Sequence, residues 1–164
     1  MTPRWYAVYT KPRWEKKVAI LLQQQGIESY CPLNKVRRRW SDRMKLIEEP
    51  LFKSYVFVKI DEPTRTAVRM TDGVINFVYW NGKPALIKEK EISTIKRFLD
   101  EHENVVLQKI EVGINERVKV IAGPMMDNEG KVLEVKHKVA KVAIDSLGYV
   151  LVATIDRSKL MAAP

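Results

Sequence analysis

Cysteine and histidine are scarce in this chain, which contains one cysteine, Cys31, and two histidines, His102 and His137. A single cysteine excludes a disulfide within the chain and suits a reducing cytoplasm, which is therefore the expected compartment. Neither histidine stands near a cysteine, histidine or aspartate at a spacing typical of metal ligands. The sequence thus predicts neither a metal site nor any other cofactor.

Long apolar runs and glycine-rich phosphate loops are also missing. No apolar run approaches the roughly 18 residues that a membrane-spanning helix requires, so we expect no membrane partner. No glycine-rich loop precedes a predicted helix, and Cys31 has no base partner close to it in the sequence. Asp61, Asp72 and Asp127 stand at turn signals, where aspartate is expected for structural reasons. The sequence therefore predicts that the chain is not an enzyme.

Acidic residues are few in the first 60 residues, which contain 13 lysines and arginines but only 5 aspartates and glutamates. The remaining 104 residues are almost balanced, with 16 basic and 15 acidic side chains. The net charge of +9 is therefore concentrated in the N-terminal part of the chain. This distribution predicts an acidic partner for that part, and nucleic acid is favoured over an acidic protein.

Residues 55–60 have the pattern of a strand, because they are aromatic or β-branched and follow a proline-containing segment. One face of this strand carries Tyr55, Phe57 and Lys59, and the other face is aliphatic. The aliphatic face suits a core. The aromatic face is either a docking surface or the second buried face of a central strand, and periodicity alone leaves both interpretations open.

Three further elements precede this strand. Residues 5–9 form a predicted strand, and residues 13–25 a helix whose apolar positions recur at intervals of three and four. Lys17 lies off the apolar face of that helix, and Gly26 is a natural C-terminal stop. Residues 27–33 then have the pattern of another strand, interrupted by a proline.

Residues 35–45 predict a hairpin that is densely basic and ends in a polar tip. Its basic side chains can follow a phosphate backbone, and its tryptophan can stack on a base. A charged tip that only contacts solvent is the alternative, and the sequence leaves both open. The residues concerned are Arg37, Arg38, Arg39 and Trp40.

The second half of the chain changes in composition. Asn81 and Gly82 predict a tight turn between two short strands, and residues 89–99 have helical periodicity. Residues 101–110 lack strong periodicity and are interpreted as a linker. Short valine-rich runs separated by glycines follow, which is typical of a small antiparallel barrel.

The predicted fold class is α+β. An N-terminal antiparallel sheet flanked by helices is expected in residues 1–100, and an SH3-like barrel of five strands in residues 111–164. The barrel would be small, since about 50 residues are marginal for an independent domain.

Three motifs together resemble the NusG family of transcription elongation factors. The first is the strand at residues 5–9 with the basic helix that follows it, and the second is the run PLFKSYVFV at residues 50–58. These resemble the N-terminal domain of the family. The third, RVKVIAGP at residues 117–124 with Gly130, resembles its KOW module. The resemblance covers residues 4–160.

The resemblance implies that the N-terminal domain binds the clamp helices of RNA polymerase through an aromatic and apolar depression. The matching positions are Tyr9, Tyr55 and Phe57. It also implies a second contact across the polymerase, for which the nearest match is Arg65 and Thr66. This pair departs from the His-Thr-Thr segment of the specialised relative RfaH.

The resemblance further implies contacts with non-template DNA through basic residues on or next to the first helix. Nascent RNA is the other nucleic-acid partner that we expect. The comparable positions are Lys11, Arg13 and Lys17. The KOW module of the family recruits ribosomal protein or termination factor Rho through the loop after its Gly-Pro. This chain has Met125 and Met126 there, which are apolar and adaptable. A monomer is expected.

Within the family the segment at residues 38–43 is similar to the specialised paralogs of the UpxY and RfaH type. In RfaH the C-terminal module can form a helical hairpin that masks the polymerase site. Valine and isoleucine dominate residues 117–152 here and favour strands, so we expect a barrel that leaves Tyr55 and Phe57 uncovered. A ribosome-associated RNA-binding KOW protein is the alternative function.

Overall fold

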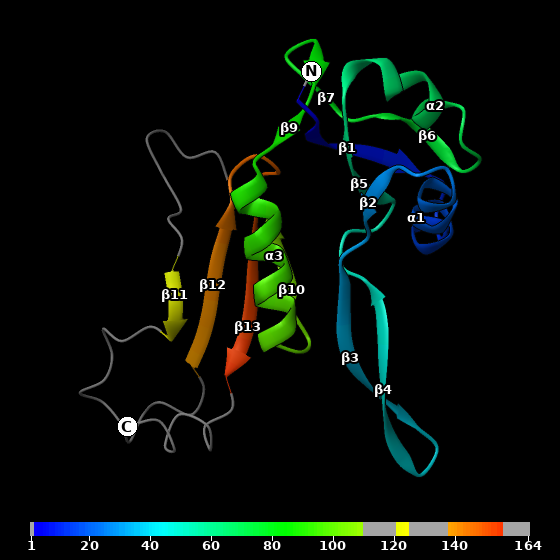
Figure 1. Ribbon diagram of the computed structural model, residues 1–164. Helices are drawn as coiled ribbons and strands as arrows, with labels where there is room; N and C mark the ends of the chain where they lie inside the picture. Colours follow the sequence, from blue (N-terminus) through cyan, green and yellow to red (C-terminus); the bar gives the residue numbers. More distant parts are fainter. Residues whose placement is uncertain (1, 110–120, 125–137, 156–164) are drawn as a thin grey trace. The chain divides into compact units, whose positions relative to one another are not determined.

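The computed structural model describes residues 2–109, 121–124 and 138–155, and combines helices with antiparallel sheets (Figure 1). This arrangement confirms the predicted α+β class. The elements are β1 Arg4–Thr10, α1 Glu15–Gln24, β2 Glu28–Tyr30, β3 Leu33–Trp40, β4 Arg43–Pro50, β5 Tyr55–Ile60, the 3-10 helix η1 Glu62–Thr64, α2 Arg65–Arg69, β6 Val74–Phe77, β7 Tyr79–Trp80, β8 Lys83–Pro84, β9 Leu86–Ile87, α3 Glu89–Glu101, β10 Val106–Lys109, β11 Ile121–Pro124, β12 Lys138–Ile144 and β13 Tyr149–Ile155.

The chain divides into two compact units that do not follow its order in sequence. The first unit comprises Met1–Leu33 and Glu49–Lys96, and the second comprises Asn34–Glu48 and Arg97–Pro164. The hairpin between β3 and β4 therefore groups with the C-terminal part of the chain. The domain boundaries predicted after residues 100 and 110 do not coincide with this division and stay a prediction.

The first unit is built on a five-stranded sheet with the order β2-β5-β1-β6, in which β9 also pairs with β1. Strand β1 runs antiparallel to β5, with Tyr9 opposite Tyr55 and Ala7 opposite Phe57. Because side chains alternate between faces, these four residues lie on one face of the sheet. The predicted strands at residues 5–9 and 55–60 are thus confirmed and are neighbours.

The opposite face of this sheet forms the aliphatic core of the first unit. Helix α1 covers it with Val18 and Leu22, and both side chains are fully buried. Burying each such side chain stabilises the fold by about 1.5–3 kcal/mol. The prediction that the aliphatic face of β5 belongs to the core is confirmed. The other members of this cluster are Tyr6, Val8, Ala19, Ile27, Val56, Val58, Ile60, Val68 and Phe77.

Helix α1 begins two residues later than predicted. Arg13 has a φ of 70°, which is outside the helical region, so the helix starts at Glu15. Its end agrees with the sequence: the N–H of Gly26 donates to the carbonyl of Gln23 at 2.9 Å, and the chain turns away into β2. Lys17 lies exposed on the solvent side, as predicted.

The β3–β4 hairpin is longer than the sequence predicted, and Ser41 and Asp42 form its tip. Asn34, which is buried, holds its base. Its side-chain amide donates to the carbonyl of Val105 at 2.8 Å, and the N–H of Val105 donates back to its Oδ1 at 3.0 Å. This reciprocal pair replaces the backbone partner that Val105 lacks before β10 begins.

The second unit contains a four-stranded antiparallel sheet with the order β10-β13-β12-β11 among the residues that the structure describes. Strand β10 (Val106–Lys109) pairs with β13, with Leu107 opposite Leu151. The interpretation of residues 101–110 as a linker is therefore wrong at these four residues. The valine-rich run at residues 131–135, which the barrel prediction includes as a strand, and the partner-binding candidates Met125 and Met126 lie outside the described residues.

Extended backbone chemical shifts are expected across residues 131–144 in the full-length protein. Strand β12 already occupies Lys138–Ile144 and pairs over its full length with β13. The remaining residues of the segment are rich in valine, which favours strands over helices. Backbone NMR assignment checks this, and helical shifts over the segment would contradict it.

Candidate functional site

Two tyrosines form an accessible aromatic pair at the end of the β1–β5 ladder. Tyr9 and Tyr55 are cross-strand partners, and their ring centroids are 5.1 Å apart with an interplanar angle of 53°. Tyr9 is 39% exposed and Tyr55 is partly buried. Aromatic cross-strand pairs stabilise a sheet while leaving ring surface for a partner. The structure thus brings together two of the three predicted docking residues as an open surface.

Phe57 differs from the prediction, because its ring is fully buried rather than part of an open face. Phe52 packs edge-on against it with 5.5 Å between ring centroids, and Tyr30 lies 6.4 Å away. Strand β5 is flanked by β2 and β1, so a side chain in its middle is covered by residues from both sides. Phe57 supports the aromatic surface from within the core.

Phe52 is a residue of this surface that the sequence reasoning did not single out. Its ring contacts both Phe57 and Tyr55, with centroids 5.5 and 6.5 Å away. It is itself buried. The sequence did contain a signal for this contact, because Leu51 and Phe52 are apolar residues in a turn directly before the strand. Turns lie at the surface, so two adjacent apolar residues there are expected to pack against the core.

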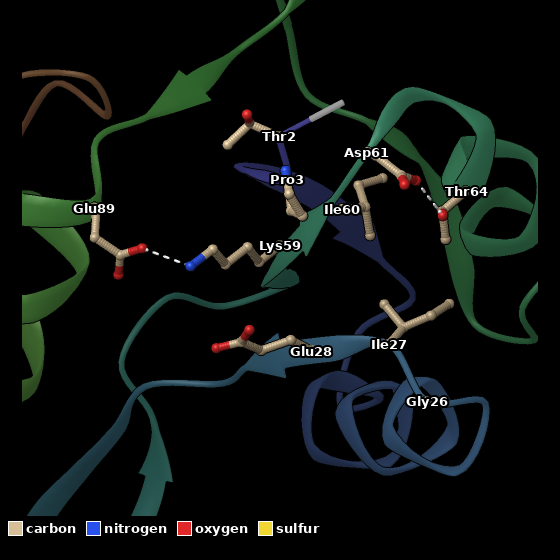
Figure 2. Close-up of a pocket in the computed structure, with 10 residues that line it drawn as sticks. All are labelled: Thr2, Pro3, Gly26, Ile27, Glu28, Lys59, Ile60, Asp61, Thr64 and Glu89. Carbon is tan, nitrogen blue, oxygen red and sulfur yellow. Dashed lines mark hydrogen bonds and ion pairs between the residues drawn. The ribbon is translucent and has the colours of Figure 1, made fainter.

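Lys59, near the other end of the same strand, forms an ion pair. Lys59 Nζ lies 2.9 Å from Oε1 of Glu89 across an open hollow of about 650 Å³ (Figure 2). The hydrogen bond that Lys59 donates to Glu89 raises the pKa of Lys59 and lowers the pKa of Glu89. Glu28 and Asp61 also line the hollow. This end of the face is therefore charged and ion-paired, and the accessible aromatic side chains lie at its other end, at Tyr9 and Tyr55.

Arg65 and Thr66, predicted for a second polymerase contact, begin α2. The guanidinium carbon of Arg65 lies 5.6 Å from the ring centroid of Tyr6, and Thr66 is exposed. Tyr6 belongs to the aliphatic face of the sheet, whereas Tyr9 belongs to the other face. The structure therefore does not bring Arg65 together with the tyrosine pair. Arg65 lines a separate open hollow of about 730 Å³, together with Arg4.

The basic residues near α1 gather around a tryptophan. Lys11 Nζ and Lys17 Nζ lie 5.4 and 4.3 Å from the ring centroid of Trp14, as in cation–π contacts. Arg13 lies exposed in the same turn. Trp14 is one of the apolar residues of the helix predicted at residues 13–25, and the sequence pattern did not indicate this role. The contacts hold two of the three basic side chains predicted near the first helix, Lys11 and Lys17, beside one indole.

Not every basic side chain of the hairpin is available for a phosphate, because Arg37 already has an acidic partner within the protein. Arg37 makes a two-point ion pair with Glu103, with its Nε 2.7 Å from Oε1 and its Nη2 3.2 Å from Oε2. Glu103 raises the pKa of Arg37. Arg39 and Trp40 are exposed, and Lys45 Nζ lies 4.9 Å from the Trp40 ring centroid. Arg38 is also exposed.

Cys31 and His102 have structural surroundings. Burial raises the pKa of Cys31 to about 11, and the charge of Glu15 adds to the effect, so its thiol is protonated at neutral pH. His102 packs against Phe98 with ring centroids 4.4 Å apart. His137 lies outside the described residues. Within the described part of the chain, the structure shows no cluster of three acidic, histidine or cysteine ligands.

Comparisons with known proteins agree with the architecture of the first unit. A family model described as "Transcription termination factor nusG" matches residues 3–96. The transcription termination/antitermination protein NusG of Synechocystis sp. is 30% identical over 163 aligned residues, covering 84% of this chain and 78% of that protein. The corresponding protein of Bacillus subtilis is 28% identical, with 88% of each chain covered.

A solved structure described as "Domain interaction in Thermotoga maritima NusG" has the same fold. It matches with a TM-score of 0.52 at 23% identity, and the match covers 95% of this chain and 94% of that one. No helix among the described residues is long and apolar enough to cross a membrane. Because the family model covers more than half of the chain, the chain belongs to the NusG family of transcription termination and antitermination factors.

Proposed function

We propose that this chain binds RNA polymerase during elongation and acts as an antitermination factor. The observation that carries the proposal is the Tyr9–Tyr55 pair, an accessible aromatic surface on the sheet of the unit that matches the family. Aromatic side chains on a rigid sheet are effective interface anchors, because they bury a large area at a small cost in conformational entropy. The clamp helices of the polymerase are the proposed partner.

A second polymerase contact is proposed at Arg65 and Thr66. Arg65 is held over the Tyr6 ring, so its guanidinium is oriented before any partner arrives. It lies at the opposite face of β1 from the tyrosine pair, which fits a protein that contacts two sides of a cleft. The departure of this segment from the His-Thr-Thr of the specialised relative means that its partner chemistry would differ as well.

Nucleic acid is the second proposed partner, as non-template DNA or nascent RNA. The side chains proposed to contact it around α1 are Lys11 and Lys17, which lie over the Trp14 indole, and the exposed Arg13. On the hairpin they are Arg38, Arg39 and Trp40. Contacts with phosphates add affinity that falls with salt but little sequence information, and the exposed tryptophan adds stacking on an unpaired base.

Replacing Arg39 with glutamine is expected to weaken binding of single-stranded DNA and to lower the slope of log K against log salt by about one. Replacing Arg37 with glutamine is the matched control: its guanidinium is already paired with Glu103, so the slope should stay the same. Fluorescence anisotropy with a labelled oligonucleotide at several salt concentrations measures both. Equal slopes for all three proteins would show that the hairpin tip only contacts solvent.

The second unit is proposed to recruit a further factor, ribosomal protein or Rho, through Met125 and Met126. We also propose that the chain is a specialised, operon-specific member of the family, acting in the cytoplasm as a monomer. No observation favours the alternative of a ribosome-associated RNA-binding protein, for which the aromatic pair on the first unit would have no use.

Footprinting of a paused elongation complex, with and without the full-length protein, tests the proposed function. We expect protection of the exposed non-template strand and a shorter pause lifetime. A protein that leaves both the footprint and the pause unchanged at saturating concentration would contradict the proposal.

A further inference from the structure

A buried carboxylate connects α1 to the loop that leads into β5. Glu15 is the first residue of α1 and only 5% exposed. Its Oε2 accepts a hydrogen bond from the backbone N–H of Ser54 at 2.6 Å, across 39 positions of sequence. Glutamates are seldom buried unless a specific partner compensates for the lost hydration. The partner that the structure shows here is the main-chain amide of Ser54.

Ser54 needs such a partner, because its backbone is in the left-handed region with a φ of 66°. That region favours glycine, and a serine adopts it only when surrounding contacts hold it there. A second contact does so from the other side: the carbonyl of Ser54 accepts a hydrogen bond from the N–H of Thr10 at 2.8 Å. Thr10 is almost fully buried. Ser54 is thus held through both its N–H and its C=O.

These contacts join the residues next to the two docking tyrosines. Ser54 precedes Tyr55 directly, and Thr10 follows Tyr9 directly. The direction in which Tyr55 leaves the loop is therefore set by the conformation of Ser54. We expect another φ at Ser54 to rotate the first residue of β5 and to break the contact between the two rings, whose centroids are 5.1 Å apart here.

We infer that Glu15 is a positioning residue for polymerase binding: it holds Ser54 in a left-handed conformation and thereby presents Tyr55 beside Tyr9. The inference rests on the proposed function for its purpose, but its geometry is independent of it. A carboxylate in the first turn of a helix also interacts favourably with the helix dipole. That effect alone would change stability and would leave the tyrosine pair as it is.

The first test measures binding of full-length variants to core RNA polymerase, with melting temperatures recorded for each. Glu15→Ala is expected to weaken binding roughly tenfold or more, since it removes a charge-assisted hydrogen bond. Glu15→Gln keeps an acceptor and should lose less. In the double variant Glu15→Ala with Ser54→Gly, binding should return close to the wild-type value, because glycine adopts the left-handed region without support. Glu28→Ala, an exposed glutamate on β2, is the charge-matched control.

Failure of the glycine rescue, or unchanged binding in Glu15→Ala, would overturn the inference. Because glycine also relieves the left-handed strain at residue 54 and so raises stability, binding is measured well below the melting temperature of every variant, where all of them are fully folded. If Glu15→Ala does not fold, Glu15→Gln with and without Ser54→Gly carries the same comparison.

The second test is independent of the polymerase. NMR of the same variants should show that Glu15→Ala loses the exchange protection of the Ser54 amide and the contact between the Tyr9 and Tyr55 ring protons, and that Ser54→Gly restores the ring contact. Unchanged protection and ring contact would overturn the inference. If the wild-type protein does not bind polymerase, the proposed function fails, and this second test alone decides whether Glu15 positions the tyrosines.

Discussion

Replacing Phe57 with alanine is expected to lower the free energy of unfolding of the first unit by about 3–5 kcal/mol. The ring is completely buried and contacts Phe52 and Tyr30, so its removal leaves a cavity lined by aromatic side chains. Neighbouring rings cannot close this space without leaving their own contacts, since a folded core is packed as tightly as an organic crystal. Urea unfolding followed by circular dichroism measures the loss.

The matched comparison is Tyr9→Ala on the same face, at a ring that is 39% exposed. Less apolar area leaves water at this position, so its cost should be clearly smaller, about 1–2 kcal/mol. If Phe57→Ala unfolds at the same urea concentration as the wild-type protein, the ring is accessible and the buried arrangement of this face is wrong.

Replacing Gly73 with alanine is expected to cost about 2–4 kcal/mol, from a left-handed backbone and from overpacking together. Gly73 has a φ of 88°, and a Cβ there would lie 2.5 Å from Cε3 of Trp14 and 2.7 Å from Cγ2 of Val18. Trp14 would have to move away from its place under Lys11 and Lys17. Weaker binding of single-stranded DNA should therefore accompany the loss of stability.

Gly82→Ala separates the two causes. Gly82 has a similar φ of 75°, but no heavy atom lies within 4 Å of the position that a Cβ would take. Only the backbone strain should appear, about 1–2 kcal/mol, and DNA binding should be unaffected. Thermal unfolding of the two variants measures the difference. Equal destabilisation would contradict the close approach of Gly73 to Trp14.

The elements that local patterns specify were predictable from the sequence. The two-residue period at residues 55–60 identifies β5 and its aliphatic face, and the aromatic strand at residues 5–9 identifies β1. The tight turn at Asn81-Gly82 is observed with φ values of 54° and 75°, which the type I′ turn requires. In each case the controlling interaction is between residues close in sequence.

The features that the sequence did not predict depend on contacts between distant residues. Whether Phe57 is exposed depends on Phe52 and on Tyr30 of another strand, and strand period says nothing about what covers a face. Arg37 forms its ion pair with Glu103, which is 66 positions away in the sequence. A dense run of arginines predicts a basic surface but cannot say which cation already has a partner.

Strand β10 escaped prediction for a related reason. Residues 106–109 alternate weakly and are only four in number, so no periodicity separates them from a linker. Their strand conformation comes from pairing with β13, where the partners Val106–Val152 and Lys109–Tyr149 are 46 and 40 positions apart. The Asn34 side chain also holds Val105, the residue before β10, through two hydrogen bonds. The two residues are 71 positions apart, so no local pattern in the sequence indicates this contact.

The most direct test of the central claim is the equilibrium affinity of the full-length protein for core RNA polymerase when Tyr55 is replaced by alanine. We expect a loss of about 1–3 kcal/mol, as for an aromatic interface anchor. Ile20→Ala, which removes an exposed apolar side chain from α1, is the control and should leave the affinity unchanged. An affinity for Tyr55→Ala equal to that of the wild-type protein, with the variant fully folded, would contradict the claim that the Tyr9–Tyr55 pair is the polymerase-binding surface.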